Sequence, residues 1–136
     1  MELLQFKILN TAIERILNNE MADIGLTYTQ ATVIGYLKQN MNKDICQKDI
    51  EYNLGLTHPT VSSILNRMEE SGMITTETLP SDHRYKKIVP TEEAISLSEC
   101  IHDKIEKIKK QLFKNISSEQ EDSLSSVIKT MIGNIS

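Results

Sequence analysis

The sequence predicts a mainly α-helical protein with one small β-hairpin, in the order α-α-α-α-β-β-α-α. Apolar residues recur at helical spacing through most of the 136 residues. Between residues 73 and 89 the pattern changes to two short stretches rich in β-branched residues. Aromatic residues are only 4% of the chain and tryptophan is absent. The remaining apolar residues, mostly Ile, Leu, Met and Val, favour helices packed on helices.

The first half of the chain contains three predicted helices. The first, at about residues 3–22, carries an apolar stripe at helical spacing. The second, at about 28–40, follows a capping box in which Thr27 is the N-cap and Gln30 is the third helical residue. The third is short, from about 47 to 54, and a tight turn separates it from the next helix.

The stretch "THPTVSSILNRMEESGMI", residues 57–74, predicts a fourth helix with two different faces. One face is apolar at i, i+3, i+4 and i+7 and must point to the core. It consists of Val61, Ile64, Leu65 and Met68. Thr57 is placed to cap the helix, and Pro59 is tolerable because first-turn N–H groups have no helical partner.

The second half begins with the hairpin and ends with two helices. "MITTETL" and "RYKKIV" are the expected strands, "PSDH" supplies the turn, and Pro90 is expected to end the hairpin. Thr91 then caps a long helix at about 92–114, with Ala94 at its third position. Ser117 and Gln120 form a second capping box before the last, strongly apolar helix.

The outward face of the fourth helix is small and polar, which suits close approach to a DNA groove. Large charged side chains would hold a helix off the groove floor, whereas first-turn amides can bind phosphate. Asn66 suits adenine, and Arg67 suits guanine or phosphate. The hairpin segment 78–91 has three Lys or Arg residues and one acid, although the chain has net charge −4. The DNA-binding residues expected from these features are Gln47, Lys48, Thr57, His58, Pro59, Thr60, Ser62, Ser63, Asn66, Arg67, His83, Arg84, Lys86 and Lys87.

The segment "QKDIEYNLGLTHPTVSSILNRMEESGMI", followed by "PSDHRYKKIVPTEEA", resembles the MarR family of bacterial winged-helix transcriptional regulators. The resemblance implies that Asp82 orients Arg84, which would contact DNA at or near the minor groove. The chain departs from the family at Glu51, where Ala is frequent. Glu51 either changes the packing between the two helices or lies exposed. A second departure is the Val89-Pro90-Thr91 sequence, where Leu often precedes the Thr.

The resemblance implies a winged helix-turn-helix DNA-binding lobe with N- and C-terminal dimerisation helices. We expect one domain, 1–136, with the lobe at about 28–91 and the dimerisation helices at about 1–24 and 92–136. Apolar terminal helices need a packing partner, and a two-fold dimer would present two recognition helices to a pseudo-palindromic operator. The expected function is that of a homodimeric repressor, released by a small-molecule effector that binds between the dimerisation and DNA-binding regions.

Other classes of function fit the sequence less well. The alternative is a winged helix that binds proteins without specific DNA binding, but such a module has no need for Arg84, Lys86 and Lys87 together. No Gly-rich phosphate loop, metal cluster or triad is recognisable, so we expect no enzyme, cofactor or metal. No apolar run approaches the ~18 residues of a membrane span, and a cytoplasmic location without a membrane partner is expected.

The two cysteines, Cys46 and Cys100, have no metal-ligand spacing and are expected to be reduced thiols without a redox role. A branch of the family that the chain resembles senses peroxide with a cysteine early in its first helix, and this chain has no cysteine before Cys46. Of the two, Cys46 is the better candidate for reactivity, since a thiol near a helix N-terminus can have a lowered pKa.

Overall fold

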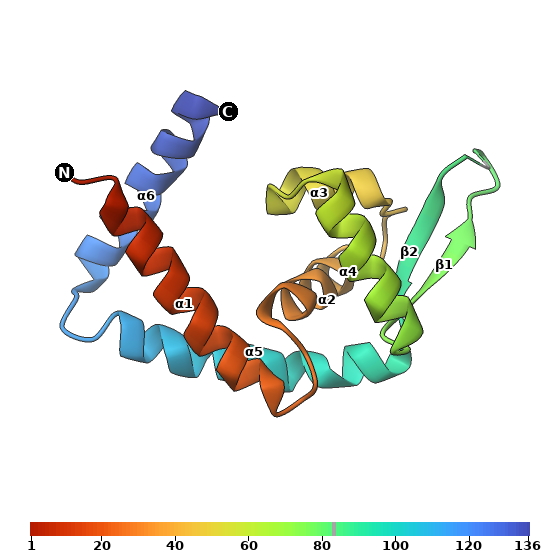
Figure 1. Ribbon diagram of the computed structural model, residues 1–136, viewed down its shortest axis with the longest axis horizontal. Coiled ribbons are helices and arrows are strands. Elements are labelled where there is room, and N and C mark those ends of the chain that lie inside the picture. The colour runs from red at the N-terminus through yellow and green to blue at the C-terminus, as the bar shows by residue number, and fades with distance from the viewer. Residues whose placement is uncertain (83) are drawn as a thin grey trace. The chain divides into compact units, whose positions relative to one another are not determined.

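The computed structural model describes residues 1–82 and 84–136, and its elements follow the predicted order. The chain forms two compact units, residues 1–104 and 105–136. Figure 1 shows the elements with their labels. Their bounds are α1 Leu4–Ala22, α2 Tyr28–Gln39, α3 Gln47–Leu54, α4 His58–Glu70, β1 Ile74–Thr78, β2 Lys86–Pro90, α5 Glu92–Leu112 and α6 Ser118–Ile135. The mainly α-helical fold with one hairpin is therefore confirmed.

The core of the first unit forms where α2, α3 and α4 meet the base of the hairpin. Ile34 of α2, Ile50 of α3 and Met68 of α4 are completely buried, and Ile74 opens β1 with almost no exposed surface. The predicted inward face of α4 is confirmed, with three of its apolar residues buried and Ile64 half-buried. Burying this face forces the polar side of α4 outward.

The hairpin is antiparallel, with Ile74 paired to Pro90 at its base and Thr78 paired to Lys86 at its far end. Pro90 is the last residue of β2, so the hairpin ends at Pro90 as predicted, although Pro90 itself belongs to the strand. A further backbone bond ties the hairpin to the segment before α3, since the Ile88 N–H donates to the Ile45 carbonyl at 2.8 Å. This bond anchors the base of the hairpin beside the start of α3.

Most of the predicted helix caps of the first unit are present. Thr27 and Gln30 form both bonds of their capping box. The Ala94 N–H donates to the Thr91 hydroxyl at 3.2 Å, as expected at the start of α5. The prediction for Thr57 was wrong in one respect. Thr57 is the N-cap residue of α4, but its side chain accepts no capping bond and its hydroxyl instead donates to the Thr60 hydroxyl at 2.9 Å.

The second unit consists of the end of α5 and the whole of α6. The turn between the two helices includes Asn115 in the left-handed region, at φ 65°. Ser117 and Gln120 form the predicted capping box at the start of α6. The apolar residues of α6 are exposed, namely Leu124, Val127, Ile128, Met131, Ile132 and Ile135. Among the described residues of the two units, no helix is long and apolar enough to span a membrane.

Candidate nucleic-acid interface

The outward face of α4 is formed by small or polar side chains, as the sequence predicts. Pro59, Thr60, Ser63, Asn66 and Arg67 are all exposed. They lie opposite the buried apolar residues of the same helix. The structure thus brings these predicted contact residues to one accessible surface on a helix whose other side is fixed in the core.

The N-terminus of α4 offers fewer free amides than a helix without proline. Val61 N–H donates to the Thr57 carbonyl at 3.0 Å and so belongs to the helix. Pro59 has no N–H to donate. Within the described part of the chain, the backbone amides of His58 and Thr60 have no hydrogen-bond partner. These two amides can meet phosphate, as amides at helix N-termini do.

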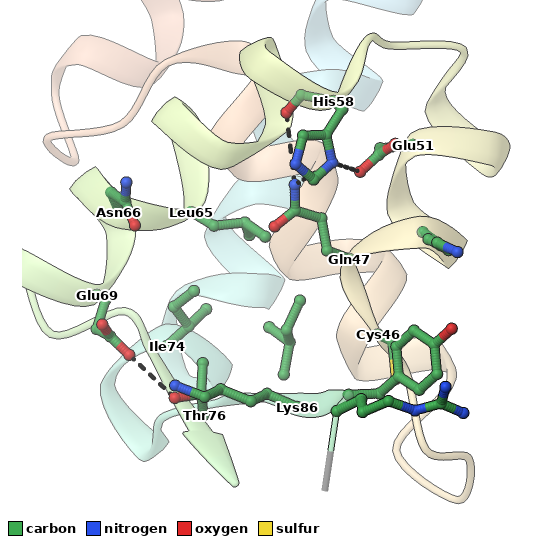
Figure 2. Close-up of a pocket in the computed structure, with 14 residues that line it drawn as sticks. Cys46, Gln47, Glu51, His58, Leu65, Asn66, Glu69, Ile74, Thr76 and Lys86 are labelled. Atoms are coloured by element: carbon green, nitrogen blue, oxygen red, sulfur yellow. Dashed lines mark hydrogen bonds and ion pairs between the residues drawn. The ribbon is translucent and has the colours of Figure 1, made fainter. Parts of the chain in front are cut away.

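A polar network joins α3 to α4, and three predicted DNA-binding residues take part in it. The side-chain amide of Gln47 donates to the Ser62 hydroxyl at 2.8 Å. Nδ1 of His58 lies 2.8 Å from Oε2 of Glu51, and Figure 2 shows the ring between Glu51 and Gln47. Gln47 and Ser62 are half-buried, whereas His58 is exposed. Gln47 and Ser62 therefore help to fix the angle between α3 and α4, and their side chains are only partly accessible at the surface.

The network decides between the two alternatives left open for Glu51. Its side chain is 19% exposed and is paired with His58, so it bridges the two helices rather than lying free on the surface. Sequence reasoning did not assign this role. A signal was present, because Gln47 and Glu51 share one face of α3 at i, i+4 and His58 and Ser62 share one face of α4 at the same spacing.

In the hairpin, Asp82 holds Arg84 through three hydrogen bonds. Nε of Arg84 donates to Oδ1 of Asp82 and one terminal guanidinium nitrogen donates to Oδ2, both at 3.1 Å. The Arg84 backbone N–H also donates to Oδ1 at 3.1 Å. The Arg84 side chain nevertheless remains 83% exposed. The expected orienting geometry is present, and it leaves the guanidinium accessible. His83, between the two, lies outside the described residues.

These three bonds between Asp82 and Arg84, called the clamp below, favour the charged form of the Asp82 carboxyl. The side-chain bonds from Arg84, and then its backbone bond, lower the pKa of the Asp82 carboxyl below its ordinary value. A carboxyl whose pKa is lowered by folding contributes stability above its unfolded pKa and loses it as the pH falls through the folded pKa. The clamp is therefore fully formed at neutral pH and is lost only in acid.

The other basic residues of the hairpin differ in their availability. Lys86 is exposed. Lys87 is 26% exposed, and its ammonium lies 3.5 Å from the carboxylate of Asp44. Lys87 is thus partly neutralised by a neighbour, whereas no ion pair of Lys86 is found among the described residues.

A hollow of about 440 Å³ lies between α3, α4 and the hairpin, and predicted residues from all three elements line it. Asn66 of α4 and Lys86 of the hairpin are both on its wall (Figure 2). Tyr85 also lines it, although the sequence did not single it out. The Lys48 ammonium lies 5.5 Å from the centre of the Tyr85 ring and the Arg84 guanidinium 5.7 Å, within cation–π range. Tyr85 thus links the hairpin to α3.

Cys46 is the N-cap residue of α3, and its surroundings oppose the lowered thiol pKa that such a position can give. Burial raises the pKa of its thiol, and the carboxylates of Asp49, Asp44 and Asp82 raise it further. The Asp49 carboxylate accepts a bond from the Cys46 backbone N–H at 2.9 Å. The local negative charge therefore opposes the thiolate, contrary to the general expectation for helix N-termini.

A helix-turn-helix with a polar outward face, followed by a basic hairpin, defines the winged-helix class of DNA-binding proteins. The MarR family model matches residues 24–84. The S. aureus MepR–DNA complex is 22% identical, with a TM-score of 0.87 over 97% of this chain and 94% of that chain. The transcription regulator MarR from Oenococcus oeni PSU-1 is 26% identical, with a TM-score of 0.79 over 95% and 96%. A MarR-family transcriptional regulator from Listeria monocytogenes, solved with 26mer DNA, is 21% identical, with a TM-score of 0.88 over 99% and 89%.

Residues 24–84 thus match the MarR family model, and the chain has the fold of these solved transcription regulators.

Proposed function

We propose that the chain is a homodimeric repressor that reads a pseudo-palindromic DNA operator and is released by a small molecule. The observation that carries the proposal is the joint placement of two features. Asn66, from the small polar face of α4, and the exposed Arg84 held by Asp82 line the same hollow. Two structures similar to this chain were solved with DNA, which supports the same function.

In this proposal the residues of the lobe fall into three groups by role. Ser63 and Asn66 read base edges in the major groove, where small polar side chains can approach closely. Basic and helix-terminal groups meet phosphate, and Arg84 enters or borders the adjacent minor groove. The phosphate and helix-terminal group contains Lys48, Thr57, Pro59, Thr60, Arg67, His83, Lys86 and Lys87. The group that orients α4 or Arg84 contains Gln47, Ser62 and Asp82, and His58 lies with Ser63 and Asn66 on the surface that faces DNA.

The dimer is supported by the exposed apolar residues at both ends of the chain. Leu3 is 79% exposed, and Leu4 and Ile8 are each 61% exposed. The apolar residues of α6 are exposed as well. Patches of this kind mark interaction sites in proteins that are otherwise polar outside. We propose that residues at about 1–24 and 92–136 form the dimer and that the lobe at about 28–91 reads DNA.

Release by an effector follows from linkage between two sites. Successive major grooves are about 34–36 Å apart, and the two recognition helices must match this spacing to bind the operator. A small molecule that binds better to a dimer with another spacing weakens operator binding. By linkage, the operator weakens binding of the small molecule by the same factor. We place this molecule between the dimerisation and DNA-binding regions. A regulator that acts on the chromosome of a bacterium works in the cytoplasm, which is the location we propose.

Selection of bound sequences from random duplex DNA tests the function. The proposal predicts enrichment of one site with two inverted half-sites whose centres are about 10–10.5 base pairs, or a multiple of that spacing, apart. A selection that converges on no sequence contradicts it and favours a protein-binding role for the winged helix.

A further inference from the structure

His58, the first residue of α4, forms a short polar contact with Glu51 of α3. Its Nδ1 atom lies 2.8 Å from Oε2 of Glu51. A carboxylate only accepts hydrogen bonds, so the ring proton must be on Nδ1. The His58 side chain is 71% exposed and that of Glu51 only 19% exposed. The pair therefore presents the ring, rather than the carboxylate, to the surroundings.

Gln47 lies close to the same ring nitrogen but does not compete for it. Its side-chain nitrogen is 3.1 Å from Nδ1 of His58. Two donors cannot bond to each other, so this approach is not a hydrogen bond once Nδ1 carries the proton. The two amide protons of Gln47 instead have acceptors in the Ser62 hydroxyl at 2.8 Å and the His58 carbonyl at 3.4 Å. Gln47 thus holds the start of α4, while Glu51 holds the ring.

The proton on Nδ1 determines what the other ring nitrogen offers. In a neutral imidazole with its proton on Nδ1, Nε2 carries a lone pair and accepts. In the part of the chain that the structure describes, nothing bonds to Nε2 of His58. Residues at the start of a recognition helix contact base edges. The exocyclic amino groups of cytosine and adenine are the hydrogen-bond donors in the major groove.

Given the DNA-reading function proposed above, we propose that Glu51 is a positioning residue for sequence recognition. It fixes the proton and the orientation of His58, so that Nε2 selects adenine or cytosine, which carry an amino group in the major groove, over thymine or guanine at one position on one strand of each half-site. Glu51 touches no base in this arrangement and acts through His58.

The first test uses the DNA-free protein. The ¹⁵N NMR signals of the His58 ring are recorded at pH 8, where an imidazole is ordinarily neutral, and His58→Ala identifies them. We expect the proton on Nδ1 in the wild-type protein and a shift of population to Nε2 in Glu51→Ala. A wild-type ring with its proton on Nε2, or one unchanged by Glu51→Ala, overturns the proposal.

The second test compares operator and scrambled duplexes in competition titrations. Glu51→Ala should lower the operator preference by roughly tenfold per half-site, the size of one lost base contact. The loss should fall at the same base pair as in His58→Ala, and adding Glu51→Ala to His58→Ala should cause no further loss. Glu70→Ala is the charge-matched control, because Glu70 is an exposed acid on the same helix as His58. It should strengthen binding to both duplexes slightly and leave their ratio unchanged.

The outcomes separate the possible failures. A wild-type protein with no operator preference contradicts the DNA-reading function itself, before any variant is compared. A wild-type protein that prefers its operator, with a Glu51→Ala ratio equal to that of the wild type, contradicts only the role of Glu51. A lowered melting temperature for Glu51→Ala with an unchanged ratio also contradicts that role, because the carboxylate would then only join two helices.

Discussion

Truncation of Ser63 and Asn66 separates base reading from general affinity. Both side chains are exposed and uncharged, and neither forms a hydrogen bond within the described residues. Their replacement by Ala removes no contact that supports the fold, so the free energy of unfolding should change by less than about 0.5 kcal/mol. Any larger effect on DNA binding must then come from the interface itself.

The size of that effect follows from the proposed symmetry. One lost base contact costs about 1–3 kcal/mol, and a dimer loses the contact in both half-sites. Ser63→Ala or Asn66→Ala should therefore weaken operator binding by about 2–6 kcal/mol, which is at least about 30-fold. Binding to scrambled DNA should hardly change, because no phosphate contact is removed.

Competition titrations against operator and scrambled duplexes at one fixed salt concentration measure both quantities. Asn42→Ala replaces an exposed asparagine in the turn after α2, is the matched control and should bind both duplexes as the wild type does. Equal losses on the two duplexes would show that this face of α4 does not read bases. Unchanged binding to both would show that α4 is not the recognition element.

The remaining predictions concern the hairpin and the cysteines. Arg84→Ala should weaken binding to every DNA sequence and leave the fold intact, with only a small fall in melting temperature, because the exposed guanidinium contacts only Asp82 and the Tyr85 ring among the described residues; unchanged operator affinity would refute the assignment of the hairpin. Lys86→Ala should reduce the slope of log K against log salt by about one unit per protomer. Lys87→Ala should reduce it by less, because Asp44 already partly neutralises this lysine, and an equal reduction would argue against that pairing. Replacing Cys46 and Cys100 with Ser should leave DNA binding and its response to peroxide unchanged, and a peroxide-induced loss of binding that disappears in the double variant would contradict this.

The sequence predicted the elements of this fold because their signals are local. Gly55 adopts φ 64° at the end of α3, a conformation that a glycine readily supplies. Two capping boxes mark the starts of α2 and α6, and each depends on residues three apart. The buried face of α4 follows from helical periodicity alone. Each of these signals can be read within one or two turns of helix.

The parts of the site that sequence reasoning missed are set by contacts between elements. Gln47 and Ser62 are fifteen positions apart, and their bond depends on the angle between α3 and α4. The pairing of Lys87 with Asp44 likewise requires the hairpin to fold back beside the start of α3. The raised pKa of the Cys46 thiol depends on burial and on Asp82, which is far along the chain. Helical spacing groups Gln47 with Glu51 and His58 with Ser62, but periodicity and composition do not show which elements meet.

The most direct test of the central claim is a hydroxyl-radical footprint of the wild-type protein on its selected duplex. Two recognition helices in successive major grooves, with hairpins at their flanks, predict a symmetric pattern about the centre of the site. The two major-groove segments should lie about one helical turn apart, and the outer minor-groove protection should disappear in Arg84→Ala while the inner pattern persists. A single protected segment, or an outer pattern that Arg84→Ala leaves intact, would contradict the proposed docking of a dimer through α4 and the hairpin.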